Sequence, residues 1–312
     1  MKEISIVIPC YRSAAFLESV VAEILDKTKG LALKEIILVD DGSPDDVWSV
    51  IKKLSKEHEL IKGIHFSRNF GQHAALMAGY RKAGGDYIIT MDDDGQSLPE
   101  GIEKLIEELD TGVDVVYAKY PHYQKSVFRV FGSFLNRKMS EVLVEKPKTI
   151  QGNSFFGMQA FIKDEIIRYD HSYPYIGGLI FRATQNITEV EIEQRKRKEG
   201  RSTYSLSKLI KLWLNGFTAF SILPLRIASF LGIICAAFGF LLGIFFIVRK
   251  LLNPEILLGY SSLISVILFI GGVLMMMMGM LGEYVGRLYI NSNCSPQYVI
   301  KSTTDDAGGE SS

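Results

Sequence analysis

Residues 87–96 read Tyr-Ile-Ile-Thr-Met-Asp-Asp-Asp-Gly-Gln, and the organisation of the whole chain follows from this stretch. Its apolar first half is typical of a strand, and a glycine soon ends it. Asp92 and Asp94 would lie on one side of an extended chain, and Gln96 continues the alternation. Oxygen ligands suit hard cations that also carry phosphates, so these three residues predict a Mg²⁺ or Mn²⁺ site. The alternative is a solvated acidic turn.

Strand-like and helix-like segments alternate through the first 117 residues. This alternation predicts an α/β fold with a mostly parallel sheet, whose ligands bind at the carboxyl ends of the strands. Polar residues gather at those ends, as in Asp40-Asp41-Gly42-Ser43. Asp40 or Asp41 could accept hydrogen bonds from a nucleobase or ribose, or the motif could simply be a turn that caps the next helix. The expected strands are 4–8, 36–39, 64–66, 87–91 and 113–117, and the expected helices are 15–28, 47–56, 72–83 and 98–109.

The last third of the chain has the pattern of a membrane anchor. Residues 227–248 and 256–282 contain no charged side chain, and each run matches or exceeds the ~20 residues that a helix needs to cross a bilayer. Two earlier stretches have a broad apolar face with basic residues, a pattern that favours interfacial helices. The expected organisation begins with a catalytic domain at 1–200, which includes an interfacial helix at 123–144. A juxtamembrane helix at 201–224 and transmembrane helices at 225–250 and 256–284 follow. The chain ends in a tail at 285–312 that is disordered from Thr303.

Charge and motif content exclude several classes of protein. Lys plus Arg and Asp plus Glu each number 35, which argues against a general nucleic-acid binder. Basic residues crowd the approach to the first span, so the positive-inside rule predicts a multi-pass protein of the inner (plasma) membrane with a cytoplasmic catalytic domain. The sequence lacks the glycine-rich motifs of dinucleotide oxidoreductases and P-loop NTPases. Glycine-rich faces of the spans are compatible with a homo-oligomer.

In this order, the motifs resemble the family-2 inverting glycosyltransferases of the GT-A fold. The resemblance is to membrane-anchored polyprenyl-phosphate glycosyltransferases, a group that includes undecaprenyl-phosphate glucosyltransferases and dolichyl-phosphate mannose synthase, and it covers about residues 4–300. The motifs that carry it are at residues 7–11, 39–43, 67–73, 92–96, 197–205, 281–287 and 296–298.

The resemblance implies that a sugar moves from a nucleotide-sugar, most often UDP- or GDP-linked, to a polyprenyl phosphate such as undecaprenyl phosphate. It assigns the divalent metal to Asp92 and Asp94, with Gln96 as a further ligand. The acceptor phosphate is already anionic, so the protein mainly positions the substrates and neutralises charge. The implied donor-site residues are Pro9, Tyr11, Asp40, Asp41, Arg68 and Asp93. The implied acceptor-phosphate residues are Arg129, Ser133 and Arg197, with Lys119 and Arg201 as further candidates. Arg129 and Arg197 could instead meet lipid headgroups.

The chain departs from the family pattern at several positions. Arg12-Ser13 replaces the usual Asn-Glu, which touches the donor contacts. Asn153 follows Gly152 where many members have an aspartate proposed to act in catalysis. Thr203 stands where lysine is frequent, and Arg201 could supply that charge.

Two other functions are compatible with this sequence. The first is a family-2 transferase that acts on a lipid-linked saccharide, and the second is a nucleotide-sugar-binding membrane subunit without turnover, suggested only by Asn153. A channel or transporter component is disfavoured because the apolar runs at 227–248 and 256–282 contain no charged residue.

Overall fold

The computed structural model describes residues 2–120, 150, 152–193, 195, 223–252, 260–292 and 296–305. The chain divides into two compact units. The first unit is Met1–Thr203 together with Cys294–Ser312, and the second is Tyr204–Asn293. Both ends of the chain therefore belong to the first unit.

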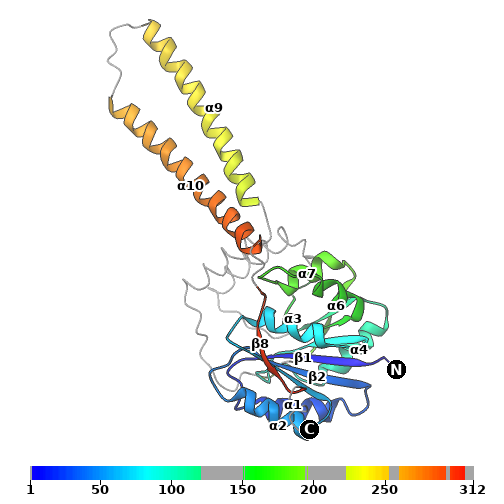
Figure 1. The fold of residues 1–312 in the computed structure, drawn as a ribbon. Helices are drawn as coiled ribbons and strands as arrows, with labels where there is room; N and C mark the ends of the chain where they lie inside the picture. The colour runs from blue at the N-terminus through cyan, green and yellow to red at the C-terminus, as the bar shows by residue number, and fades with distance from the viewer. Residues whose placement is uncertain are drawn as a thin grey trace. The chain divides into compact units, whose positions relative to one another are not determined.

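Within the described residues, eight strands of the first unit form one sheet in the order β7-β5-β6-β4-β1-β2-β3-β8 (Figure 1). Strands β6 and β8 run antiparallel to their neighbours, and the other pairs are parallel. The predicted α/β fold with a mostly parallel sheet is confirmed. The strands are β1 (Ile4–Cys10), β2 (Leu33–Asp40), β3 (Ile61–Phe66), β4 (Tyr87–Thr90), β5 (Val115–Lys119), β6 (Phe156–Gln159), β7 (Ile187–Glu191) and β8 (Ile300–Thr303).

Helices cover both faces of the sheet. One face packs against α1, α2 and α4, and the other packs against α3, α6 and α7. All seven residues of β1 are buried, and successive side chains alternate between the two cores, Ile6 and Ile8 in one and Val7 in the other. Because a central parallel strand is covered on both sides, its sequence is mainly apolar, and the one hydroxyl in β1, that of Ser5, donates to Glu35 at 2.9 Å. The helices are α1 (Leu17–Lys27), α2 (Val47–Glu57), α3 (Gln72–Lys82), α4 (Gly101–Asp110), α6 (Ala160–Ile167) and α7 (Ile176–Ala183).

The register of the sheet brings the carboxyl ends of β1 to β4 to one edge. Cys10 at the end of β1 pairs with Asp40, Asp40 pairs with His65 of β3, and Val7 pairs with Thr90 at the end of β4. The antiparallel β6 starts at this same edge, since its first residue, Phe156, also pairs with Thr90. The turn before β6 therefore joins the loops after β1, β2, β3 and β4.

The second unit consists, within the described residues, of two long helices, α9 (Leu223–Leu252) and α10 (Tyr260–Ser292). They fall on the predicted spans at 225–250 and 256–284, but α10 continues eight residues beyond residue 284. Large apolar side chains are exposed on both, Met275 being 79% exposed. In the part of the chain that the structure describes, the window Phe269–Gly286 of α10 is long and apolar enough to cross a membrane, and α9 contains a shorter apolar stretch, Gly232–Phe245.

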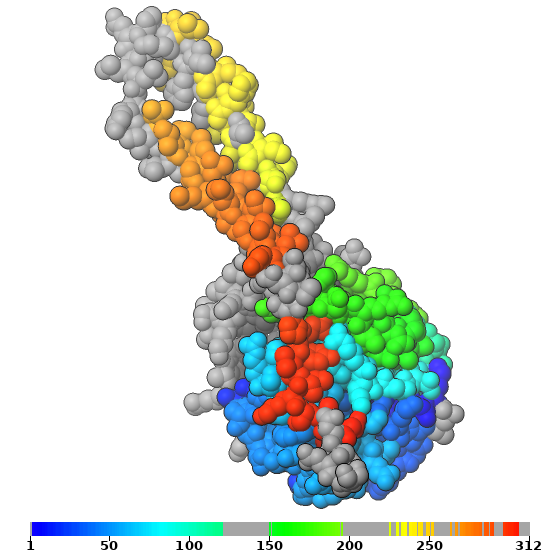
Figure 2. Space-filling view, viewed as in Figure 1, coloured from blue at the N-terminus to red at the C-terminus, as the bar shows by residue number. Residues whose placement is uncertain are grey.

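The start of the predicted disordered tail is ordered. Thr303 ends β8, which pairs with β3, and the backbone N–H of Thr304 donates to the carbonyl oxygen of Gly63 at 3.0 Å. We expected disorder from Thr303 because the residues there are polar. Polar composition cannot show that β3 has an unpaired edge, to which β8 adds as a further strand. In Figure 2 the red C-terminal residues lie on the surface of the first unit, beside its blue and cyan residues. Residues 306–312 lie outside the described residues.

Candidate active site

Five aspartates gather at the carboxyl edge of the sheet. Asp40 is the last residue of β2 and Asp41 follows it, and Asp92, Asp93 and Asp94 follow β4. Both loops begin with a backbone bond to β1, which lies between β2 and β4: the N–H of Asp41 donates to the carbonyl oxygen of Cys10 at 3.1 Å, and the N–H of Met91 donates to that of Val7 at 3.3 Å. Parallel strands thus bring residues fifty positions apart to one site, as the sequence predicted for strand ends.

Asp92 is held by two side chains that the sequence analysis did not single out. Gln72, the first residue of α3, donates from Nε2 to Asp92 Oδ1 at 2.9 Å, and Ser154 Oγ, in the turn before β6, donates to Oδ2. Burial raises the pKa of Asp92, and the nearby Asp94 carboxylate raises it further. Two carboxylates that repel each other are a place where a cation is stabilising.

Asp94 and Gln96 form a tight turn next to Asp92. Gln96 donates its backbone N–H to Asp94 Oδ1 at 3.0 Å and its side-chain N–H to Oδ2. Gly95 between them has a φ of +67°, a conformation that glycine adopts without strain. Arg195 fastens this turn from the other side: its N–H donates to the Gln96 carbonyl at 3.1 Å, and its guanidinium binds both carboxylate oxygens of Glu23 in α1 at 2.8 and 2.5 Å.

The chemistry of this donor set fits Mg²⁺ or Mn²⁺. Asp92 and Asp94 supply two carboxylates that lie close enough to interact electrostatically, and Gln96 adds an amide oxygen. Among the described residues, no three His, Cys, Asp or Glu side chains form a closed cage. A closed cage is not required, because Mg²⁺ is commonly held by one or two carboxylates together with water and substrate phosphates.

Asp93 turns toward β1 and away from the Asp92 contacts. Its Oδ2 accepts the backbone N–H of Tyr11 at 2.9 Å. Burial raises the pKa of Asp93 to about 6. In this structure Asp93 therefore ties the loop after β1 to the loop after β4.

Asp40 and Asp41 are both buried and both organise loops. Asp40 accepts the N–H of Ser43 at 2.8 Å and lies 2.7 Å from Nδ1 of His65, whose ring stacks on Trp48 at 5.0 Å. Asp41, 3% exposed, accepts three hydrogen bonds from residues 69–71, two of them from backbone N–H groups at 2.7 and 2.9 Å. Burial raises the pKa of the Asp41 carboxyl. Asp40 therefore closes the turn at residues 40–43 and Asp41 holds residues 69–71, whereas the N-cap of α2 is Asp46; the assignment of Asp40 and Asp41 to a donor site stays a prediction.

The other predicted donor residues differ in exposure. Pro9 is buried inside β1, whereas Tyr11 is 42% exposed. Arg68 lies over the Phe70 ring, with its Cζ 4.7 Å from the ring centroid. Arg12, at the position where the family has a different residue, is exposed and has a φ of +59°.

Of the predicted acceptor residues, Lys119 is the one that the structure describes. It ends β5, and its Nζ lies 3.3 Å from Oε1 of Glu191 at the end of β7. The predicted acceptor residues Arg129, Ser133, Arg197 and Arg201 lie outside the described residues. So do nearly all of the predicted interfacial and juxtamembrane helices at 123–144 and 201–224.

Tyr120 and Asn153 also belong to this edge. The Tyr120 hydroxyl lies 3.2 Å from Ser97 Oγ, and burial followed by the charges of Asp92 and Asp94 raises its pKa. Asn153 donates from Nδ2 to the Ala118 carbonyl and accepts the N–H of Phe155 at 2.9 Å. The departure from the family motif at Asn153 was visible in the sequence, but its contact with Ala118, 35 positions away, was not.

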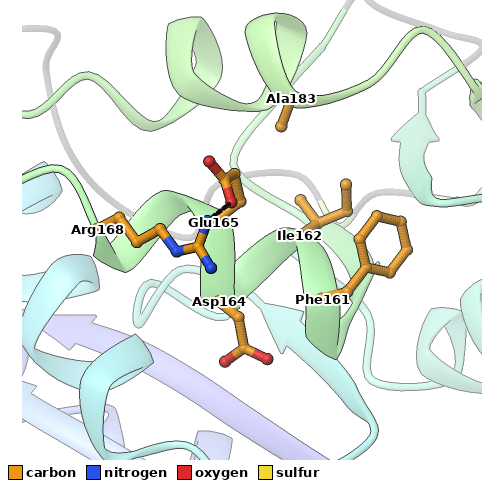
Figure 3. A pocket seen from close by; sticks show the side chains of 6 residues that line it. All are labelled: Phe161, Ile162, Asp164, Glu165, Arg168 and Ala183. Atoms are coloured by element: carbon orange, nitrogen blue, oxygen red, sulfur yellow. Dashed lines mark hydrogen bonds and ion pairs between the residues drawn. The ribbon is translucent and has the colours of Figure 1, made fainter.

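A separate hollow lies between α6 and α7 (Figure 3). Its volume is about 480 Å³, and none of the predicted site residues lines it. Of its three charged lining residues, Glu165 and Arg168 bind each other at 2.7 Å, and Asp164 lies 2.6 Å from the ammonium of Lys163. The residues that line it are Phe161, Ile162, Asp164, Glu165, Arg168 and Ala183.

Comparison with known proteins gives two family matches. Residues 5–167 match the model of glycosyl transferase family 2, and residues 223–288 match the GtrB C-terminal hairpin. The chain is 33% identical over 305 residues to the undecaprenyl-phosphate 4-deoxy-4-formamido-L-arabinose transferase of Yersinia enterocolitica, covering 96% of this chain and 93% of that protein. It is 31% identical to the uncharacterized glycosyltransferase YkcC of Bacillus subtilis, covering 95% and 93%.

Solved structures support the fold. Glucosyl-3-phosphoglycerate synthase from Mycobacterium tuberculosis, in complex with Mn²⁺, UDP and glucosyl-3-phosphoglycerate, aligns with a TM-score of 0.53 at 17% identity. The alignment covers 70% of this chain and 79% of that one. At this identity the likeness concerns the arrangement of the sheet and its helices.

Proposed function

The chain belongs to glycosyl transferase family 2, and from that membership we propose that it is a membrane-anchored enzyme that transfers a sugar from a nucleotide-sugar to a polyprenyl phosphate. The observation that carries the proposal is the similarity along nearly the whole chain, hairpin included, to transferases named for undecaprenyl phosphate. A match to the catalytic domain alone would support sugar transfer without indicating a lipid acceptor.

The donor would bind at the carboxyl edge of the sheet. We assign the divalent cation to Asp92, Asp94 and Gln96, and the cation would neutralise the diphosphate that leaves with the nucleoside. The raised pKa of Asp92 beside Asp94 supports this assignment, because a cation relieves the repulsion between the two carboxylates. The nucleoside side of the pocket would be shaped by the residues assigned from the sequence, namely Pro9, Tyr11, Asp40, Asp41, Arg68 and Asp93.

The acceptor phosphate needs a cationic partner near the cation site. Arg195 bonds the Gln96 carbonyl, and Arg197 follows only two residues later, within about 7 Å along an extended chain. This tether supports Arg197 as an acceptor-phosphate residue, together with Arg129, Ser133, Lys119 and Arg201. A guanidinium matches a phosphate in geometry as well as charge.

In the proposed reaction a phosphate oxygen of the acceptor attacks the anomeric carbon. The bond from that carbon to the diphosphate oxygen breaks, and the nucleoside diphosphate leaves with the electron pair. The acceptor is already ionised, so no protein group has to remove a proton from it, and Asn153 in place of an aspartate is compatible with turnover.

The return of the chain to its own sheet supports a hairpin anchor. Residues 2–120 and 300–303 share one sheet although α9 and α10 lie between them in sequence. A segment that leaves a folded unit and comes back to it must cross the bilayer an even number of times. We propose that α9 and α10 both cross, with the first unit in the cytoplasm and basic residues of the preceding segment at the inner surface.

The test is product analysis with the purified full-length protein in lipid nanodiscs. It would be incubated with undecaprenyl phosphate, Mg²⁺ or Mn²⁺ and a panel of UDP- and GDP-sugars, and the lipids would be analysed by mass spectrometry. We expect one lipid species heavier by a single sugar residue, absent after chelation of the metal and absent with Asp94→Ala. Transfer only to a lipid-linked saccharide would replace the proposed acceptor. Nucleotide binding without any lipid product would favour a subunit that lacks turnover.

A further inference from the structure

The chain ends in an extended segment, residues 296–305, that lies against the first unit; we name it the C-terminal strap. Its β8 portion pairs with β3, and Thr304 exchanges two hydrogen bonds with Gly63, at 3.0 and 2.9 Å. Asp305 lies 2.5 Å from the Lys82 ammonium at the end of α3. The strap therefore closes the β3 edge of the sheet.

The first residues of the strap are held more firmly than an edge strand requires. Gln297 is buried and donates from Nε2 to the carbonyl oxygens of Tyr169 and His171, at 2.8 and 2.9 Å. The Tyr298 hydroxyl accepts a hydrogen bond of 2.7 Å from Arg81 of α3. The Tyr298 ring lies flat on Phe66, the last residue of β3, with the centroids 5.0 Å apart and the planes 7° apart.

These contacts reach the loop at residues 67–71, which we name the donor loop. The N–H of Ser67 donates to the carbonyl oxygen of Val299 in the strap at 3.0 Å. Phe66, covered by Tyr298, meets Phe70 edge-on with centroids 5.8 Å apart. The first residue of the donor loop, Ser67, is thus bonded to the strap. The ring of Phe70, near the other end of the loop, packs on Phe66, which Tyr298 of the strap covers.

The other side of the donor loop faces the carboxyl edge of the sheet. Asp41 accepts the N–H groups of Phe70 and Gly71, and the next residue, Gln72, binds Asp92 at 2.9 Å. The donor loop therefore connects a carboxylate on the proposed nucleoside side with one on the proposed cation side. A shift of this loop would move both.

We infer that Tyr298 is a positioning residue for nucleotide binding: by stacking on Phe66 it fixes the donor loop, and through that loop it fixes Asp41 and Asp92. The inference rests on the proposed function, because it takes the carboxyl edge to be the donor site. It gives the strap a role in affinity for the nucleotide, in addition to closing the sheet. Tyr298 itself does not touch substrate in this arrangement.

The test compares variants of Tyr298 in the full-length protein. Tyr298→Ala removes the ring, Tyr298→Leu keeps an apolar cover without a stacked ring, and Tyr298→Phe keeps the ring but loses the bond from Arg81. Calorimetric titration with UDP, and separately with GDP, would be done in Mn²⁺. An aromatic pair of this kind corresponds to a change of about three- to tenfold in affinity. We expect Kd to rise by that factor for the Ala and Leu variants and to stay within about twofold for the Phe variant.

Asp305→Ala is the matched control, because it removes a strap contact at the far end from the donor loop. Its nucleotide Kd should equal that of the wild type, and no variant should change the KM for undecaprenyl phosphate. The inference is overturned if Tyr298→Ala and Tyr298→Leu bind nucleotide as tightly as the wild type. It is also overturned if Tyr298→Phe is as weak as they are, or if the donor and acceptor KM values rise together.

The calorimetric measurement separates this inference from the proposed function. A wild-type protein that binds nucleotide but makes no lipid product refutes the proposed reaction and still tests Tyr298. A wild-type protein that binds neither UDP nor GDP refutes both.

Discussion

At the scale of single residues, Gly42 shows how closely the loops at the carboxyl edge of the sheet are packed. Its φ is +60°, and a Cβ added there would lie 2.3 Å from the carbonyl carbon of Arg68 in the donor loop. Left-handed backbone costs a non-glycine residue about 1–2 kcal/mol, and overpacking against backbone adds about 1–3 kcal/mol. We expect Gly42→Ala to lower the free energy of unfolding by about 2–5 kcal/mol, measured by thermal unfolding in detergent.

Gly30→Ala is the control for that substitution. Gly30 has no heavy atom within 4 Å of an added Cβ. Its replacement should change stability by less than about 0.5 kcal/mol. Equal unfolding temperatures for the two alanine variants would mean that the donor loop moves aside without cost, and would weaken the case for a rigid edge.

His73 predicts how stability depends on pH. Its ring lies edge-on to Tyr175 with centroids 5.2 Å apart, and burial lowers the pKa of His73 to about 4. Between pH 6.5 and about 4 the unfolded chain binds a proton here that the folded chain does not, so this residue makes stability fall as pH falls through that window. The unfolding temperature of His73→Phe should therefore drop less than that of the wild type between pH 7.5 and 5.

The exposed His58 supplies the comparison for this pH effect. His58→Phe should retain the pH dependence of the wild type, because it replaces an exposed imidazole and leaves the buried His73 in place. A His73→Phe variant whose unfolding temperature falls as steeply with pH as the wild type's would show that the buried imidazole is not the group responsible.

At the scale of secondary-structure elements, the turn before β6 shows what Asn153 does at a position where many family members have an aspartate. Its hydrogen bonds predict the effect of restoring the aspartate. Its amide uses both ends, donating to Ala118 and accepting from Phe155. An aspartate cannot donate, and its charge would face the Ala118 carbonyl oxygen. We expect Asn153→Asp to cost about 1–3 kcal/mol of stability and to leave kcat no higher, as measured by unfolding and by the lipid-product assay.

Asn153→Ala separates the effect of a negative charge at this position from the effect of losing the two hydrogen bonds. It removes both hydrogen bonds without adding a carboxylate, so it should be more stable than Asn153→Asp. A gain in kcat with Asn153→Asp would contradict this interpretation and would indicate that a carboxylate at this position can take part in the reaction.

The elements differed in how well their sequence predicted them. Strands β1 to β5 could be predicted because strands covered on both faces carry mainly apolar runs. The structure places Asp92 and Asp94 close together, and their role as cation ligands stays a prediction. Strand β7 is only partly buried along its length, and β8 is a polar four-residue segment, so neither shows a hydrophobic pattern. The roles of Gln72 and Ser154 depend on contacts across 20 and 62 positions, which spacing cannot show.

At the scale of the whole molecule, the anchor and the catalytic edge are linked through the chain itself. Three residues, 293–295, separate the end of α10 from the C-terminal strap, and the strap contacts the donor loop. The covalent path from α10 to the proposed donor loop is therefore short.

The same connectivity predicts the topology of the hairpin. Because the strap pairs with β3, both ends of the hairpin lie on the side of the first unit, and the loop at 253–259 must lie on the opposite side if α9 and α10 cross. Alkaline phosphatase inserted in that loop should be active, whereas the same enzyme fused after Ser312 should be inactive, and green fluorescent protein fused before Met1 should fluoresce. An inactive phosphatase in the loop, with the fusion protein intact on a blot, would mean that the helices lie at the surface or re-enter without crossing. The window Phe269–Gly286, whose one charged side chain is Glu283 near its end, argues for crossing, since a helix that lies in the interface needs one polar face.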